Sequence, residues 1–400
     1  MLTSHPVSQP VSLPVRDSTQ IRHTFDVVSH NKGAAVIGML HSYLSDSVFM
    51  GGIRHYLSEH RYDSAKPDDL WRAMTETAQR SNMTIGVKSL MDTWITQTGY
   101  PVVTVTVRET HIHLQQNLFT ILPQNDTGTV WQIPFTFYTS SSSAVISHLM
   151  KSKEEVIELP EDAVWIKANV NSTGFYRVSY DSRTLGRLHS QLQGSQPALG
   201  PADRAGLVDD AFHLARQGSL KYCDAFTLST FLMKEEEYLP ITVFINHMMN
   251  MIIKFSFRGE HCITRLLKEH LWAILGRQAG AQRWEDAGSL SVQIRRVKLL
   301  EVAVRTDRSP ASEQEALRLF HFWMAKDGDY LLPSSLRGLI FQVAVMSGGH
   351  EEWTYLLQKY CHCSSSKEKV LMLTALCHTK DREKIQWQTW DKNNGMDKEI

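Results

Sequence analysis

The 400-residue sequence lacks features that mark several large classes of protein. Lys and Arg together number 42, and so do Asp and Glu, so there is none of the basic excess that nucleic-acid-binding proteins usually show. We therefore predict no nucleic-acid partner. The N-terminal stretch MLTSHPVSQPVSLPV has neither the basic region nor the unbroken apolar core of a signal peptide. We therefore predict no targeting segment in this chain.

Long hydrophobic runs are also absent. The longest apolar stretch, LPITVFINHMMNMIIKF at 239–255, is interrupted by Pro240, Asn246, His247 and Asn250. It is shorter and more polar than the ~20 apolar residues that are needed to span a bilayer. We therefore expect a buried helix at this position and no transmembrane segment in the chain.

Cysteine is scarce and irregularly spaced. An odd number of residues at these intervals is not a disulfide framework. The Cys-His-Cys and Cys-His clusters near the C-terminus do not have the spacing of a common zinc site, so we interpret them as ordinary thiols. The five cysteines are Cys223, Cys262, Cys361, Cys363 and Cys377.

Three N-x-[ST] triplets are candidate glycosylation sites, with acceptors at Asn82, Asn125 and Asn171. Each falls at an expected turn or loop edge, where a glycan acceptor must lie. Such triplets also arise by chance, so each one alone is a weak signal. The three asparagines can be glycosylated only if the chain reaches a secretory lumen.

The hydrophobic periodicity divides the chain into three parts, and it predicts a multidomain, mainly α-helical protein with a small β-sandwich. Residues 1–99 form the first part, which has helical spacing after a proline-rich entry. The third of its expected helices opens with a proline and two acids, which favour a helix N-terminus. The expected helices begin at Gly33 and cover 48–60, 67–79 and 87–99.

Residues 100–185 form the second part, where the period changes to that of strands. In the run 102–116, apolar Val103 and Val105 alternate with threonines. Several short strands separated by turn signals predict a small antiparallel β-sandwich. The further strand-like runs lie at 130–139, 164–170 and 174–181.

Residues 186–400 form the third part, where helical spacing returns. Paired helices without intervening strands suggest an α-helical repeat domain of the HEAT or armadillo kind, although no strict sequence period occurs. The clearest expected helices cover 202–218, 291–304, 314–326 and 335–347.

Three segments carry a resemblance to a known family: DSTQIRHTFDVVSHNKGAAVIGML at 17–40, MDTWITQTGYPVVTV at 91–105 and DAVWIKANVNSTGFYRVSYD at 162–181. They resemble the zinc aminopeptidases of peptidase family M1, oxytocinase subfamily, which includes the endoplasmic reticulum and leucyl-cystinyl aminopeptidases. The likeness extends over nearly the whole chain.

This resemblance implies an architecture and an activity. Residues 1–99 resemble the C-terminal helices of a thermolysin-like catalytic domain, 100–185 a β-sandwich, and 186–400 a truncated helical domain that closes over the active site. The implied activity is removal of N-terminal residues from peptides. The family also implies a membrane-anchored protein with luminal or extracellular domains, in the endoplasmic reticulum, an endosome or at the cell surface. Its implied partners are peptides and a homodimer or heterodimer with related aminopeptidases.

The chain lacks the family's zinc-binding and substrate-binding motifs. The family holds zinc with HExxH and a downstream Glu, and it grips the substrate amine with a GxMEN strand. Neither motif occurs here, since HEEWT at 350–354 ends in Thr354. We therefore expect zinc in full-length relatives but none on this chain, no activity from this chain alone, and truncation at both ends. The alternative is a non-catalytic short form that binds peptides, or that dimerises with a full-length relative and modulates it.

Two residues fall at functional positions of the family. His30 stands where the family has a tyrosine whose phenol donates a hydrogen bond to the oxyanion of the tetrahedral intermediate. Either His30 is a substitute donor or it is a tolerated change at a site no longer used, and we favour the second interpretation. Phe25 matches an aromatic residue that lines the pocket for the substrate's first side chain, and a core Phe is the equal alternative.

Several charged residues are expected to be solvated. We place Lys32 on the surface and interpret Glu235–Glu237 as a solvated acidic run. Arg295, Arg296 and Lys298 lie on one expected helix, and we favour a solvated face. The alternative is that these cations hold a peptide carboxylate, because the arginine fork suits that group.

Overall fold

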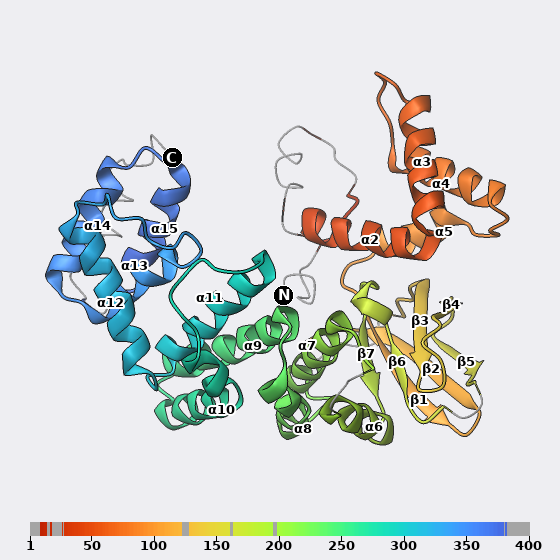
Figure 1. Cartoon of the computed structure of the whole chain (residues 1–400). Helices are drawn as coiled ribbons and strands as arrows, with labels where there is room; N and C mark the ends of the chain where they lie inside the picture. The colour runs from red at the N-terminus through yellow and green to blue at the C-terminus, as the bar shows by residue number, and fades with distance from the viewer. Residues whose placement is uncertain are drawn as a thin grey trace. The chain divides into compact units, whose positions relative to one another are not determined.

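The chain is mainly helical and contains two small sheets, which confirms the coarse prediction from the sequence (Figure 1). It divides into two compact units, Met1–Ser229 and Thr230–Ile400, and each is described by itself below. The computed structural model describes residues 9–13, 17, 26, 28–121, 128–160, 163–194, 198–379 and 381.

The first unit begins with helices whose positions follow the apolar periodicity. Helix α2 buries Val36, Leu40 and Leu44 completely, at the i, i+4 spacing that places them on one face. Helix α4 begins at Pro67, and the carboxylate of Asp69 accepts from the backbone N–H of Lys66. The elements are η2 (Val28–Lys32), α2 (Gly33–Leu44), α3 (Asp46–Glu59), α4 (Pro67–Arg80) and α5 (Val87–Ile95).

The two sheets of this unit share one buried core. Their strand orders are β5-β2-β1-β7 and β4-β3-β6, and among the described strand pairs only β1–β7 is parallel. Val105 of β1 and Phe137 of β3 belong to the same continuous cluster of buried side chains. The strands are β1 (Pro101–Arg108), β2 (His111–Leu118), β3 (Ile133–Thr139), β4 (Ile146–Met150), β5 (Glu154–Glu158), β6 (Ile166–Ala168) and β7 (Arg177–Tyr180).

Three helices complete the first unit after the last strand. Asp181 caps α6, since its carboxylate accepts from the backbone N–H of Thr184 at 2.9 Å. The short 3₁₀ turn η3 (Val170–Ser172) packs on α7. The helices are α6 (Ser182–Gln193), α7 (Pro201–Gln217) and α8 (Tyr222–Leu228).

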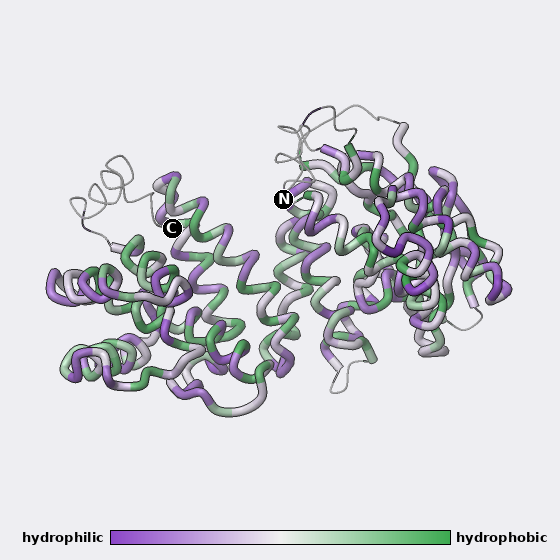
Figure 2. The backbone as a smooth tube through the Cα atoms, turned by 90° about the horizontal axis from the view of Figure 1, so that it is seen from above, coloured by the Kyte–Doolittle hydropathy of each residue, from purple (hydrophilic) through white to green (hydrophobic). Residues whose placement is uncertain are grey.

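The second unit contains consecutive helices. Hydrophilic and hydrophobic residues follow one another closely along the backbone tube (Figure 2). The run expected to be a buried helix is α9, which buries Phe244, Ile245 and Met248. None of the helices described is both long and apolar enough to cross a bilayer. The helices are α9 (Tyr238–Phe257), α10 (His261–Gly280), α11 (Leu290–Arg305), α12 (Pro310–Ala325), α13 (Arg337–Ser347), α14 (His350–His362) and α15 (Ser366–Leu376).

Two charges expected to be solvated are buried in this unit. The Glu235 side chain accepts from the backbone N–H groups of Glu236 and Glu237, and only 7% of the residue is exposed. Arg296 donates to the carbonyls of Glu285 and Ala287 at 2.8 and 2.7 Å. The prediction was wrong for these two residues because their partners are backbone groups in the connections between helices, which helical spacing does not reveal.

Candidate functional site

The turn that carries His30 is η2, a five-residue π-helix of sequence VSHNK that runs directly into α2. Such turns are rare in proteins, and those that occur are often found at functional sites. Asp26 holds its start, because the carboxylate accepts from both the backbone N–H and the hydroxyl of Ser29 at 2.7 Å. The side-chain amide of Gln9 donates to the other carboxylate oxygen at 2.8 Å. These hydrogen bonds, chiefly the backbone one from Ser29, hold the pKa of Asp26 below its usual range.

Lys32 ends this turn and is buried, with 1% of the residue exposed, so its predicted surface position was wrong. Its Nζ donates to the carbonyl oxygens of Gln97 and Gly99, at 2.9 and 2.8 Å. Burial lowers the pKa of Lys32 to about 8, since a desolvated ammonium is less stable. The lysine therefore ties the turn to the connection between α5 and β1, more than sixty residues further along the chain.

His30 lies between these two anchors and is exposed. The carbonyl oxygen of Asp26 accepts from its backbone N–H at 3.1 Å and lies 3.0 Å from its Nδ1. Phe25, the other candidate from the resemblance, lies outside the described residues. The roles assigned to both residues therefore stay predictions.

The residues around His30 do not fit a zinc ion. The turn itself contributes no carboxylate, and the ammonium of Lys32 at its end would repel a metal cation. Taken one at a time, neither unit brings three His, Cys, Asp or Glu ligand atoms together among its described residues. That this chain binds no zinc in solution stays a prediction.

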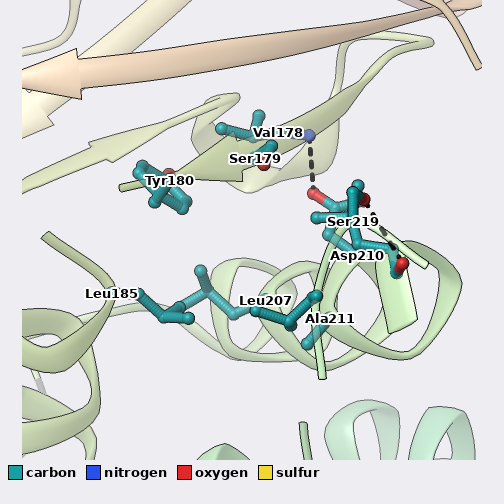
Figure 3. A pocket seen from close by; sticks show the side chains of 10 residues that line it. Val178, Ser179, Tyr180, Leu185, Leu207, Asp210, Ala211 and Ser219 are labelled. Carbon is teal, nitrogen blue, oxygen red and sulfur yellow. Dashed lines mark hydrogen bonds between the residues drawn. The ribbon is translucent and has the colours of Figure 1, made fainter. Parts of the chain in front are cut away.

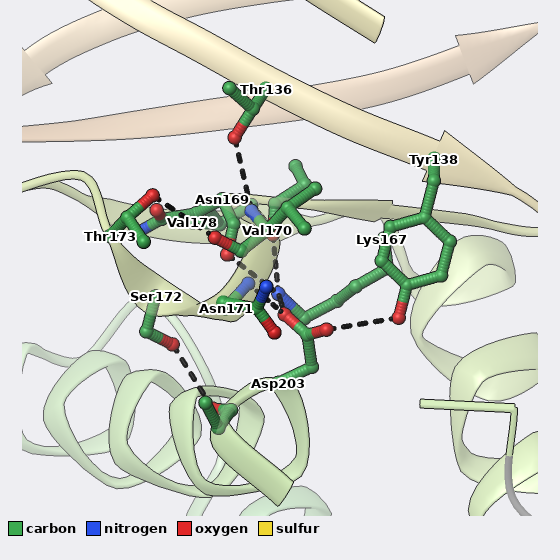
Figure 4. A network of polar contacts seen from close by, with 12 residues as sticks. Thr136, Tyr138, Lys167, Asn169, Val170, Asn171, Ser172, Thr173, Val178 and Asp203 are labelled. Carbon is green, nitrogen blue, oxygen red and sulfur yellow. Dashed lines mark hydrogen bonds and ion pairs between the residues drawn. The ribbon is translucent and has the colours of Figure 1, made fainter. Parts of the chain in front are cut away.

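A second polar cluster, which was not predicted from the sequence, lies where the sheets meet α7 (Figure 4). Lys167 of β6 forms a 3.1 Å ion pair with Asp203 of α7, and both side chains are 3% exposed. Asp203 also accepts from the hydroxyl of Tyr138 at 3.0 Å and from the backbone N–H of Asn171 at 2.7 Å. Lys167 donates further to the carbonyls of Ala168 and Asn169. Each charge is thus paired and hydrogen-bonded, which a buried ion pair requires.

A small cavity lies between β7 and α7 (Figure 3). Its volume of about 40 Å³ is enough for one or a few water molecules and far too small for a peptide side chain pocket. Asp210 lines it and accepts from the backbone N–H of Val178 at 3.0 Å. Burial raises the pKa of Asp210, while the guanidinium of Arg177, 2.9 Å away, opposes that change. This cavity is part of the packing and not a substrate site.

Two of the three candidate glycan acceptors can be located. Asn82 follows α4 and Asn171 lies in η3, and both are exposed residues with left-handed φ values of 60° and 54°. Asparagine tolerates this conformation better than most residues, which suits both positions to tight turns. Asn125 lies outside the described residues. Modification at any of the three sites stays a prediction.

Comparison with family models first defines the class: residues 2–94 match the model of the Peptidase family M1 domain. Residues 165–399 match the model of the ERAP1-like C-terminal domain, and the chain belongs to this family. The predicted resemblance to the oxytocinase-like aminopeptidases of family M1 is therefore confirmed.

Individual relatives agree with this assignment. The chain is similar to endoplasmic reticulum aminopeptidase 1 of Homo sapiens, with 35% identity that covers 95% of this chain and 43% of the relative. Endoplasmic reticulum aminopeptidase 2 of Homo sapiens is 31% identical, over 94% of this chain and 42% of the relative. Glutamyl aminopeptidase of Bitis rhinoceros is 31% identical, over 95% and 39%. The chain thus spans less than half the length of these relatives.

Proposed function

We propose that this chain contributes the C-terminal portion of a zinc aminopeptidase that removes N-terminal residues from peptides, and that it has no such activity alone. The observation that carries the proposal is a 35% identity to an aminopeptidase over 95% of this chain. The lack of activity is inferred from the absence of HExxH and GxMEN in the 400 residues. Peptides are the proposed ligands of the assembled protein, and zinc is its proposed cofactor.

The finer architecture belongs to the same proposal. We assign residues 1–99 to the helical end of a catalytic domain, 100–185 to a β-sandwich and 186–400 to a HEAT-like or armadillo-like helical domain. The core shared by the two sheets supports the sandwich. The succession of helices from α9 to α15, in which chain neighbours such as α9 and α10 pack together, supports the helical repeat.

The proposed location is the lumen of the endoplasmic reticulum, an endosome or the cell surface, in a membrane-anchored protein. The exposure of Asn82 and Asn171 supports this location, because a glycan needs an accessible acceptor. Asn125 is proposed as a third acceptor from its sequence triplet alone. In the assembled protein, Phe25 is proposed to line the pocket for the first residue of the peptide.

An immunoblot of native tissue with an antibody against residues 128–160 tests this proposal, with and without enzymatic removal of N-glycans. A band far above 45.6 kDa that shifts on deglycosylation is the expected result. A single band near 45.6 kDa that does not shift would contradict both the larger protein and the luminal location.

The second candidate is a short form that binds peptides or dimerises with a full-length relative. Exposed apolar residues on α2 and α3 favour it, since Ile37 is 40% and Leu57 is 61% exposed. Light scattering of the purified chain, alone and mixed with a related aminopeptidase, separates the two proposals. A stable mixed dimer would favour the short form, and its absence would leave the first proposal.

A further inference from the structure

The connection between helices α9 and α10 forms an exposed end of the second unit. Helix α9 ends at Phe257 and α10 begins at His261, and Gly259 turns the chain between them with a left-handed φ of 73°. The two helices pack against each other (Figure 1). None of the residues from 253 to 266 is buried. This segment, which we call the hairpin tip, therefore projects from the body of the unit.

We propose that the hairpin tip binds the surface of a bilayer that contains anionic phospholipids. The proposal goes beyond the proposed aminopeptidase function and does not depend on it. Two features of the tip support it, namely a group of exposed apolar side chains and an excess of positive charge.

Four large apolar side chains are exposed on the tip. Phe257 is the most exposed of them, at 88%, and Leu266 follows at 59%. Because a helix rises about 1.5 Å per residue, all four lie within about 8 Å of the connection along the helix axes. Single exposed apolar residues are ordinary on a protein surface, whereas a group of them at one place indicates an interaction site. The four residues are Ile253, Phe257, Ile263 and Leu266.

The tip also has an excess of positive charge. Residues 253–266 include three cations and one acid, although the whole sequence has equal numbers of both. Long cationic side chains can lay their apolar stems against hydrophobic groups and keep their charges at the level of the lipid headgroups. An anionic, partly apolar surface is therefore the complement of the tip. The four charged residues are Lys254, Arg258, Glu260 and Arg265.

The shape of the tip favours a bilayer over a peptide or a protein segment. Such segments are usually bound in grooves whose walls bury the side chains of the ligand. The tip is instead the projecting end of two helices, which can enter the headgroup layer. Amphipathic helices bind there by burying aromatic and aliphatic side chains, while their Lys and Arg residues are attracted to anionic lipids. In this arrangement Phe257 inserts among the lipids and Arg258 meets the headgroup phosphates.

Co-sedimentation of the full 400-residue chain with vesicles tests the proposal. The vesicles contain phosphatidylcholine alone or phosphatidylcholine mixed with phosphatidylserine, and each is measured at low and at high salt. We expect binding to the mixed vesicles and several-fold weaker binding to phosphatidylcholine alone. High salt should weaken the binding to the mixed vesicles, because it screens the attraction between the charges. No binding to the mixed vesicles at low salt, or equal binding to both kinds, would overturn the proposal.

Two pairs of variants show whether the tip makes the contact. Phe257→Ser should lower the partition coefficient about tenfold or more, because a large apolar side chain no longer inserts. Its control is Leu331→Ser, at an 86% exposed leucine between α12 and α13. Arg258→Gln should lower the partition coefficient about fivefold. Its control is Arg277→Gln, at an exposed arginine near the other end of α10.

Both controls should leave the partition coefficient nearly unchanged, and equal effects within either pair would overturn the proposal. All four side chains are exposed, so we expect the variants to fold. If Phe257→Ser does not fold, the comparison of Arg258→Gln with its control still decides the question.

Two further measurements test for a different occupant of the tip. Light scattering over a range of chain concentrations would detect a dimer, and Phe257→Ser would abolish that dimer if a second copy of the chain covered the tip. A fluorescent poly-glutamate peptide would bind if the tip recognised an acidic protein segment. We expect neither result. Either one, found without binding to vesicles, would overturn the membrane proposal.

Discussion

The first unit contains two buried lysines, and their ammonium groups are stabilised by different kinds of partner. Lys167 is 3% exposed and meets a carboxylate, that of Asp203, whereas Lys32 is 1% exposed and is held by backbone carbonyls. Burial lowers the pKa of both, but at Lys167 the negative charge of Asp203 opposes the change. The ion pair is therefore a structural junction between the sheets and α7. At Lys32 burial alone lowers the pKa, to about 8, and the ammonium is held by backbone carbonyls.

The largest expected effect comes from breaking the ion pair. Asp203→Ala leaves the Lys167 ammonium buried without its counter-charge, and it removes the acceptor of Tyr138 and Asn171. Removing one partner of a buried pair typically costs about 3–5 kcal/mol. We expect a loss of that size in urea unfolding of the chain. The matched control is Asp329→Ala at an exposed aspartate. A loss as small as that of the control would mean that the pair is not a structural junction.

The second prediction concerns how the stability contributed by Lys32 depends on pH. Its folded pKa of about 8 lies below the ordinary 10.5, so between these values the unfolded chain binds more protons than the folded one. The free energy of unfolding contributed by this residue should therefore rise with pH across this window, by about 3 kcal/mol in total.

Unfolding curves of the unmodified chain and of Lys32→Met, recorded from about pH 7 to pH 10.5, measure this contribution. The stability of the unmodified chain relative to the variant should increase through the window. Parallel pH profiles for the two proteins would show that Lys32 has an ordinary pKa. The burial of Lys32 would then have no effect on its pKa, and Lys32 could not be compared with Lys167 in this respect.

The smallest expected loss of stability tests whether the hydroxyl of Tyr138 is part of the ion-pair network. Tyr138→Phe removes one hydroxyl donor to Asp203 and leaves the ion pair in place. The loss of one hydrogen bond of this kind should cost about 1–2 kcal/mol in the same unfolding assay. Tyr222→Phe, at a 40% exposed residue, is the control and should change stability little. Equal effects of the two substitutions would remove Tyr138 from the network.

The elements that could be predicted from the sequence are those with a strong local pattern. Helices α2 to α4 follow the apolar spacing, and Pro67 marks the start of α4. Strands β4 and β5 were missed. Strand β5, Glu154–Glu158, has few apolar residues, and none of its residues is fully buried. Its place in the sheet comes from its pairing with β2, which the sequence pattern does not show.

The geometry around residue 30 could not be predicted from the sequence. The resemblance to the aminopeptidases singles out residue 30, yet nothing in the sequence places Nδ1 against the carbonyl of Asp26. The burial of Lys32 and Lys167 was also missed. Each lysine meets partners that are distant in the chain, and local periodicity contains no information about such contacts.

We propose that this chain is part of a zinc aminopeptidase and has no such activity by itself. The most direct test is hydrolysis of a fluorogenic leucine amide by the purified 400-residue chain, with added zinc and then with a chelator. A full-length related aminopeptidase in the same buffer serves as the positive control. The account predicts no turnover above the rate of the buffer alone. Zinc-dependent turnover that the chelator abolishes would contradict it.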